Sequence, residues 1–135
     1  MASGELGREN LTRALDGLAA AIALDTSRFP EFVCDVIDSG RIQKFEYSVE
    51  LFWKHLRGAL LAEGLDVPNS PRAAIKAALE RGFVTEGEYQ SALDLIADRN
   101  TCSHVYRQAL IPAMLARLPA HCRLMQIVTA RLQHL

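Results

Sequence analysis

The chain has 135 residues, of which half are apolar and 23% are charged, the composition of an ordinary globular domain. This length is enough to bury a core without disulfides or a structural metal, so we expect one folded domain over residues 1–135. Fifteen lysines and arginines against sixteen aspartates and glutamates leave a net charge of −1. That balance excludes a strongly basic protein that would hold nucleic acid along its whole surface.

The sequence carries no signal for a membrane segment, a metal site or a bound cofactor. Its apolar runs, such as residues 18–24, are too short to cross a bilayer, and its start does not resemble a signal peptide. The three cysteines, Cys34, Cys102 and Cys122, are widely spaced, which predicts a reduced, cytoplasmic protein. Histidines and cysteines do not cluster at metal-ligand spacing, and no glycine-rich phosphate loop is present, so we predict neither metal nor cofactor.

Apolar residues recur every three or four positions along the first half of the chain, which is the spacing of helix faces. This spacing predicts a first helix over residues 6–25. Pro30 then opens a long second helix that ends near residues 63–64 and is weakened at Gly40. The aromatic side chains of the second helix are assigned to the core: Phe45, Phe52 and Trp53.

The second half of the chain carries clear helix boundary signals. Ser70 and Pro71 are typical of an N-cap followed by a first helical residue, and Gly82 ends that helix. Thr85 and Glu88 form a capping box that begins a fourth helix. Pro119 is predicted to break the apolar pattern that follows, leaving a separate last helix. No segment alternates with period two, so we predict an all-α protein of about five helices.

The apolar face of the fourth helix is predicted to turn polar toward its end. The apolar positions are Tyr89, Ala92, Leu93 and Ile96, and the same spacing leads to Arg99, Asn100, Ser103 and Arg107. An unpaired buried charge is costly, so these polar residues need partners. They either satisfy one another as a structural cluster at a helix bend or line a functional site, and the residues alone leave both interpretations open.

Arg99 and His104 are the candidate catalytic residues. Guanidinium binds phosphate oxygens, while histidine can take and give protons near neutral pH, a pairing suited to metal-independent RNA cleavage. Five residues on a straight helix separate two positions by about 140°. A joint site therefore needs either a bend within residues 100–103 or a second copy of the chain.

The segment from Arg99 to Tyr106 resembles the Arg-x4-His-x-Tyr signature of the HEPN superfamily, which includes RNase toxins of the HepT kind. Residues 42–54 and 70–76 further resemble the nucleotidyltransferase substrate-binding branch. The resemblance implies an antiparallel helical bundle that forms a homodimer, with Arg99 and His104 of both copies in an interface cleft. Asn100 and Ser103, which share the polar end of the fourth helix, are the candidate supporting residues. It also implies a partner, an antitoxin-like nucleotidyltransferase that can transfer AMP to a tyrosine, whose place Tyr106 occupies.

Two functions follow as hypotheses. The chain is a metal-independent endoribonuclease toxin controlled by a nucleotidyltransferase, or it is a non-catalytic subunit that presents a substrate, RNA or a nucleotide, to such an enzyme or anchors that enzyme. Tyr106 either accepts AMP or packs its ring locally. Arg72 and Lys76, one turn apart near a helix start, either bind phosphate or belong to a solvated face. Cys102 is predicted to be a packing residue, and His55, His121 and His134 have surface or packing roles.

Overall fold

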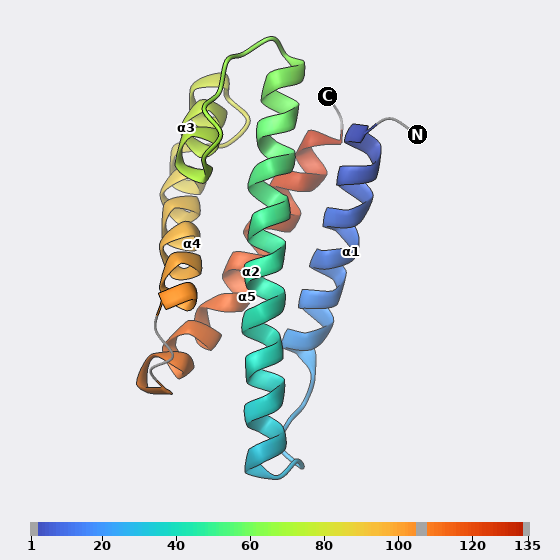
Figure 1. Cartoon of the computed structure of the whole chain (residues 1–135), viewed down its shortest axis with the longest axis vertical. Helices are drawn as coiled ribbons and strands as arrows, with labels where there is room; N and C mark the ends of the chain where they lie inside the picture. The colour runs from blue at the N-terminus through green and yellow to red at the C-terminus, as the bar shows by residue number, and fades with distance from the viewer. Residues whose placement is uncertain (1–2, 105–107, 134–135) are drawn as a thin grey trace.

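The computed structural model describes residues 3–104 and 108–133, and these form a bundle of five α-helices without a strand (Figure 1). The helices are α1 (Ser3–Ala23), α2 (Glu31–Ala62), α3 (Pro71–Arg81), α4 (Glu86–His104) and α5 (Ile111–Leu132), with a single 3₁₀ turn, η1 (Gln108–Leu110), before the last. α1 and α2 run antiparallel, α4 runs antiparallel to α2, and α5 returns toward the end where the chain starts. The predicted antiparallel all-α fold is confirmed.

Local signals set the helix boundaries in the second half of the chain. The side chain of Ser70 accepts a hydrogen bond of 3.2 Å from the backbone N–H of Ala73, and Gly82 takes a left-handed conformation at φ +86°. Thr85 and Glu88 bond reciprocally, since each backbone N–H donates to the other side chain, at 2.8 and 3.1 Å. The predicted N-cap, helix stop and capping box are therefore all present.

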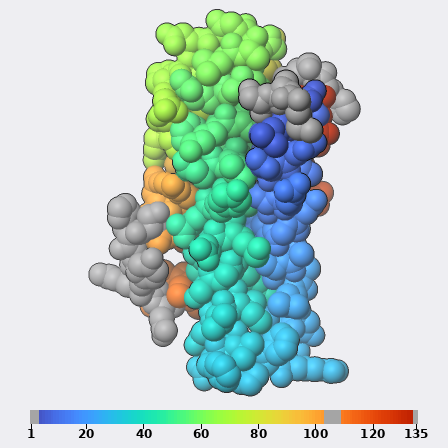
Figure 2. All heavy atoms as spheres, turned by 45° about the vertical axis from the view of Figure 1, so that its right-hand side comes forward, coloured from blue at the N-terminus to red at the C-terminus, as the bar shows by residue number. Residues whose placement is uncertain are grey.

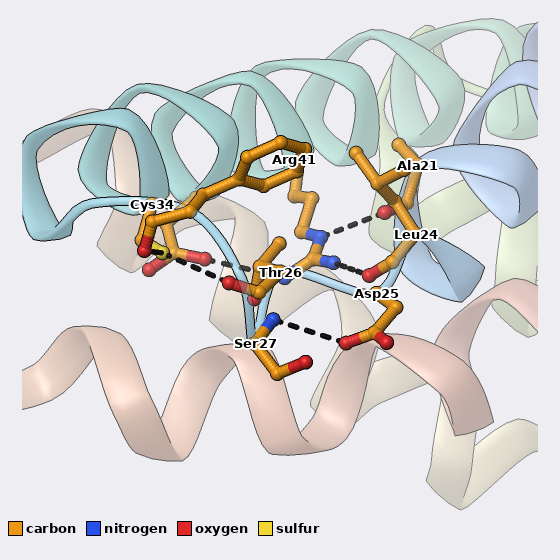
Figure 3. A network of polar contacts seen from close by, with 9 residues as sticks. Ala21, Leu24, Asp25, Thr26, Ser27, Cys34 and Arg41 are labelled. Carbon is orange, nitrogen blue, oxygen red and sulfur yellow. Dashed lines mark hydrogen bonds and ion pairs between the residues drawn. The ribbon is translucent and has the colours of Figure 1, made fainter.

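The turn between α1 and α2 is held by Arg41, which reaches back from α2 (Figure 3). Its guanidinium donates to the carbonyl oxygens of Ala21 at 2.7 Å and Leu24 at 2.8 Å, which the end of α1 leaves without helical partners. Asp25 accepts a 3.0 Å hydrogen bond from the backbone N–H of Ser27, and this contact lowers the pKa of its carboxyl. Arg41 thus fixes the direction in which α2 leaves the turn.

All five helices contribute to one apolar core. Its largest fully buried side chains are Leu11, Leu18, Phe45, Phe52, Leu56, Leu60, Ile75, Leu95, Ile96, Leu118 and Met125. Trp53 is also buried, so the assignment of the three aromatic residues of α2 to the core is confirmed. Burial of each large apolar side chain contributes about 1.5–3 kcal/mol, which is why the apolar spacing predicted the helices well.

One expectation about helix interruptions was wrong. Pro119 lies inside α5, which runs unbroken from Ile111 to Leu132. The predicted long second helix is present, since α2 continues through Gly40 as one helix. A proline removes one backbone hydrogen bond, but Pro119 is exposed and its neighbours Leu118 and Cys122 are buried. Packing on either side therefore holds α5 together across the proline.

None of the helices within residues 3–104 and 108–133 combines the length and the apolarity that crossing a bilayer requires. Cys34, Cys102 and Cys122 are free cysteines, and the last two are buried.

Candidate functional site

Arg99 lies on α4 and faces α2, where it meets a carboxylate. Its Nη2 atom is 3.0 Å from Oε2 of Glu50, and 31% of its side chain is exposed. The side chain is therefore neither buried in the core nor free in solvent, as the position of Arg99 at the end of the apolar stripe had indicated. Glu50 was not predicted, because it lies on another helix, 49 residues earlier.

Glu50 connects Arg99 to two further side chains of α2. Its Oε2 atom accepts a 3.1 Å hydrogen bond from the indole N–H of Trp53, and its Oε1 atom lies 3.2 Å from the ammonium of Lys54. Burial opposes the charged form of this carboxyl, but the Trp53 and Lys54 hydrogen bonds and the charges of Lys54 and Arg99 together lower its pKa. Glu50 is thus a charged anchor for the guanidinium at neutral pH.

A groove of about 610 Å³ runs beside this ion pair, between α2 and the junction of α4 and α5. Its lining residues are Ser39, Ile42, Gln43, Glu46, Tyr47, Glu50, Thr101, Cys102, Leu110, Ile111 and Met114. The floor is mostly apolar, and two carboxylates stand along it. Glu50 belongs both to the groove and to the Arg99 ion pair, so a molecule in the groove would lie next to the guanidinium.

The structure places the remaining predicted residues of α4 unequally. Asn100 is exposed, and its side-chain oxygen lies 3.4 Å from Nη1 of Arg99. Its predicted place on the extension of the core stripe was wrong. Ala92 and Ile96 of the predicted stripe are buried, but the buried face continues through Leu95 and Cys102, and Leu93 is only half-buried. The side chains of Ser103 and His104, and all of Tyr106 and Arg107, lie outside the described residues.

A bend within residues 100–103, one of the two arrangements that could join Arg99 and His104, is not present. α4 is helical from Glu86 to His104, so the stretch between Arg99 and His104 follows regular helical geometry. Thr101 is accommodated because its hydroxyl donates a 3.0 Å hydrogen bond to the carbonyl of Ala97, one turn earlier. Positions 99 and 104 are therefore separated by about 140° around one helix.

Cys102 is a packing residue, as predicted. It is buried, and its sulfur lies 3.7 Å from that of Met114. Burial raises the pKa of its thiol to about 11, so the nucleophilic thiolate is scarce at neutral pH.

Asp98, the residue before Arg99, forms a second polar cluster with α5 that sequence reasoning missed. Arg117 donates to both its carboxylate oxygens, at 2.7 and 2.9 Å, and Nε2 of buried His121 lies 2.7 Å from Oδ2. Burial opposes the charge of Asp98, but the bonds from Arg117 and His121 lower the pKa of its carboxyl. The spacing of Arg117 and His121, one turn apart on a helix, was the signal available in the sequence.

Arg72 and Lys76 lie apart from this region. Both are exposed on α3, and neither lines the groove beside Arg99. Within the described residues, no group of three histidine, cysteine, aspartate or glutamate side chains is arranged to hold a metal ion.

A family model described as nucleotidyltransferase substrate binding protein like matches residues 7–134. The chain belongs to this family. A solved structure from Thermus thermophilus is 36% identical to this family member, covers 90% of this chain and 98% of its own, and superposes with a TM-score of 0.79. No curated protein matches the sequence. The family match extends well beyond residues 42–106, over which the resemblance was recognised.

Two more distant solved structures share the fold of this family member. One is a tri-AMPylated HEPN toxin of Shewanella oneidensis in complex with an MNT antitoxin, with a TM-score of 0.81 over 100% of both chains at 13% identity. The other is a toxin–antitoxin complex with AMP-PNP, with a TM-score of 0.70 over 98% of this chain and 99% of its own, also at 13% identity. The predicted HEPN-like bundle is thereby confirmed as the fold.

Proposed function

We propose that this chain is the HEPN-type toxin subunit of a toxin–antitoxin pair, a metal-independent endoribonuclease. The observation that carries the proposal is the partly exposed guanidinium of Arg99, held by Glu50 at the side of a groove and followed on the same helix by His104. The family and the fold supply the context, and the segment from Arg99 to Tyr106 resembles the HEPN signature.

The chemistry assigned to the two residues is simple. Arg99 binds non-bridging oxygens of the scissile phosphate and stabilises the charge that develops there. His104 takes the proton from the ribose 2′-hydroxyl or gives one to the leaving oxygen, and two histidines can divide these tasks. We assign supporting contacts to Asn100 and Ser103.

The unbroken course of α4 supports a composite site in a homodimer. Positions 99 and 104 diverge by about 140° on one helix, so His104 of a second copy is the better partner for Arg99. Phe32 and Val36 on α2 are 71% and 68% exposed, and a second chain would cover such apolar side chains.

Control by a cognate nucleotidyltransferase completes the proposal. The Shewanella toxin of the same fold is tri-AMPylated and bound to an MNT antitoxin. We infer a comparable partner here, with Tyr106 as an AMP acceptor and both proteins in the cytoplasm, where RNA is available. Arg72 and Lys76, exposed on α3, are assigned to phosphate contacts outside the groove.

The test is cleavage of single-stranded RNA by the purified protein. Arg99→Ala and His104→Ala should each abolish cleavage, while Arg123→Ala, which removes an exposed arginine of α5, should leave it intact. A chelator should have no effect on the wild type. Absence of cleavage, or cleavage only with a divalent ion, would overturn the nuclease assignment.

The second candidate is a non-catalytic substrate-binding subunit of a two-component nucleotidyltransferase. The family description and the two carboxylates in the groove, Glu46 and Glu50, favour it, because negative charge repels a polyanion. In that case the protein would stimulate nucleotide transfer by its partner, and Arg99→Ala would reduce that stimulation without any RNA being cut.

A further inference from the structure

A small cationic hollow lies between α1 and α2, which run side by side on the face shown in Figure 2. Its volume is about 180 Å³, and its lining residues are Asn10, Arg13, Ala14, Gly17, Lys44 and Tyr47. Two cations and one amide therefore surround a space large enough for a small anionic group. No carboxylate lines it.

The two cations of this hollow, Arg13 and Lys44, are not neutralised by any of the residues that the structure describes. Neither Arg13 nor Lys44 forms an ion pair with any residue in the described part of the chain, whereas Lys54, Arg81, Arg99, Arg117 and Arg131 all do. The hollow thus keeps positive charge available for a ligand.

Tyr47 joins this hollow to the groove beside Arg99. Tyr47 lines both spaces, and 59% of its surface is exposed although it lies on α2, whose other face packs in the core. Glu50, the partner of Arg99, follows three residues later on the same helix. From Lys44 to Glu50, α2 rises by about 9 Å, which is roughly three stacked nucleotides at about 3.4 Å each.

We propose that Asn10, Arg13 and Lys44 bind a backbone phosphate of single-stranded RNA, and that Tyr47 stacks on a base between that phosphate and the groove. This inference rests on the proposed function and assigns a substrate subsite to it. Arg13 and Lys44 supply charge-assisted hydrogen bonds to the phosphate, and the amide of Asn10 donates a further one. The subsite also places RNA on a locally basic surface of a chain whose net charge is −1.

The geometry selects a single strand over a duplex. An exposed tyrosine ring can stack on an unpaired base, whose faces are available, whereas the bases of a duplex already stack on one another. The cations contact only phosphate, so the subsite confers little sequence preference. It orients the strand so that a phosphate a few nucleotides away reaches Arg99.

The test is binding of the full-length protein to a short 2′-O-methyl RNA, which lacks the nucleophile for cleavage, measured by fluorescence anisotropy across a salt series. Arg13→Gln combined with Lys44→Gln should lower the affinity at least tenfold and reduce the slope of log K against log salt by about 0.7, for the one phosphate that the two cations contact. Arg28→Gln combined with Arg123→Gln removes the same charge from exposed positions elsewhere and should change neither as much.

Two variants of Tyr47 test the stacking contact separately. Tyr47→Leu should weaken binding about fivefold or more, and Tyr47→Phe, which keeps the aromatic face, should bind like the wild type. A duplex of the same sequence should bind more weakly and be insensitive to Tyr47→Leu.

The outcomes separate this inference from the proposed function. If the Arg13 and Lys44 double variant binds like the charge control, or if the wild type does not bind the oligonucleotide, the subsite is wrong even when the protein cleaves RNA. If binding depends on Arg13, Lys44 and Tyr47 but no RNA is cut, the subsite stands and the nuclease assignment fails.

Discussion

Arg99 of α4 and Glu50 of α2 lie 49 residues apart in the sequence, and their side chains form an ion pair of 3.0 Å. The same carboxylate oxygen accepts the indole N–H of the buried Trp53. The candidate active-site arginine is therefore tied directly to the core of the bundle through a single carboxylate.

Substitution of Glu50 should destabilise the fold by an amount that depends on whether the new side chain keeps an oxygen for Trp53. Glu50→Ala leaves the indole N–H of Trp53 without its acceptor, and an unsatisfied buried donor costs about 1–3 kcal/mol. Glu50→Gln keeps an oxygen for Trp53 and should cost less, below about 1 kcal/mol. Urea unfolding measures both. Glu46→Ala, which removes a groove carboxylate with no bonding partner in the described residues, is the control, and equal losses for Glu46→Ala and Glu50→Ala would contradict the role of Glu50.

Stability should fall in acid through Glu88. Hydrogen bonds from Arg131 lower the pKa of this carboxyl to about 2, against the opposing effect of burial and with help from the N–H of Thr85. Since the folded-state pKa is depressed, the stabilisation is complete above about pH 4.5 and is lost as the pH falls toward 2. After allowance for solvent screening, we expect up to about 2 kcal/mol.

The measurement is the free energy of unfolding between pH 6 and 2, compared for the wild type and Glu88→Gln. The variant should be less stable at pH 6 and show a flatter pH dependence, whereas Glu86→Gln, which changes an exposed neighbour, should follow the wild type. A Glu88→Gln curve parallel to the wild-type curve would show that this ion pair does not report on acid unfolding.

Local chemistry explains which parts of the fold could be predicted. The Ser70 cap, the Thr85 and Glu88 capping box and the Gly82 stop each act within a few residues, so the sequence displays them directly. Pro119 misled the prediction because its effect on α5 is decided by packing on both sides, which a local pattern does not record.

For the main contact of the candidate site, the sequence predicted Arg99 but not the residue that it meets. The apolar stripe of α4 led to Arg99, but its partner Glu50 and the Asp98 cluster with Arg117 and His121 depend on how α2 and α5 pack against α4. Helical spacing defines a face and not the neighbour that the face meets. The cationic hollow of Arg13 and Lys44 was missed for the same reason, because its two cations come from different helices.

The straight course of α4 leads to a prediction about how the site is shared. If Arg99 of one copy works with His104 of the other, an Arg99→Ala chain paired with a His104→Ala chain rebuilds one intact site out of two. Isolated heterodimers carrying two different tags should then regain up to about half of the wild-type cleavage rate, although each homodimer is inactive. Heterodimers as inactive as the parents would favour a site within one chain, and a monomer in light scattering would exclude the composite site.

The final prediction concerns control by AMP. Tyr106 follows His104, the last residue of α4, by two positions, so a group on its hydroxyl would be near the proposed catalytic residues. Transfer joins the tyrosine oxygen to the α-phosphate of ATP and releases pyrophosphate, while the phenolic proton passes to solvent or a base. The attached phosphate is negative and can pair with Arg99, so that AMP excludes RNA by both charge and volume.

Incubation with the cognate nucleotidyltransferase and ATP, followed by intact-mass measurement, tests this control. The wild type should gain mass in whole AMP units and lose RNA cleavage in step, while Tyr106→Phe should gain no AMP and stay active. Tyr47→Phe, which removes the hydroxyl of the exposed Tyr47, is the matched control and should be modified like the wild type. Equal adducts on the wild type and Tyr106→Phe, or none on either, would show that Tyr106 is not the AMP acceptor. Tyr106 would then be a packing residue, a role that depends on its aromatic ring and not on attachment of AMP to its hydroxyl.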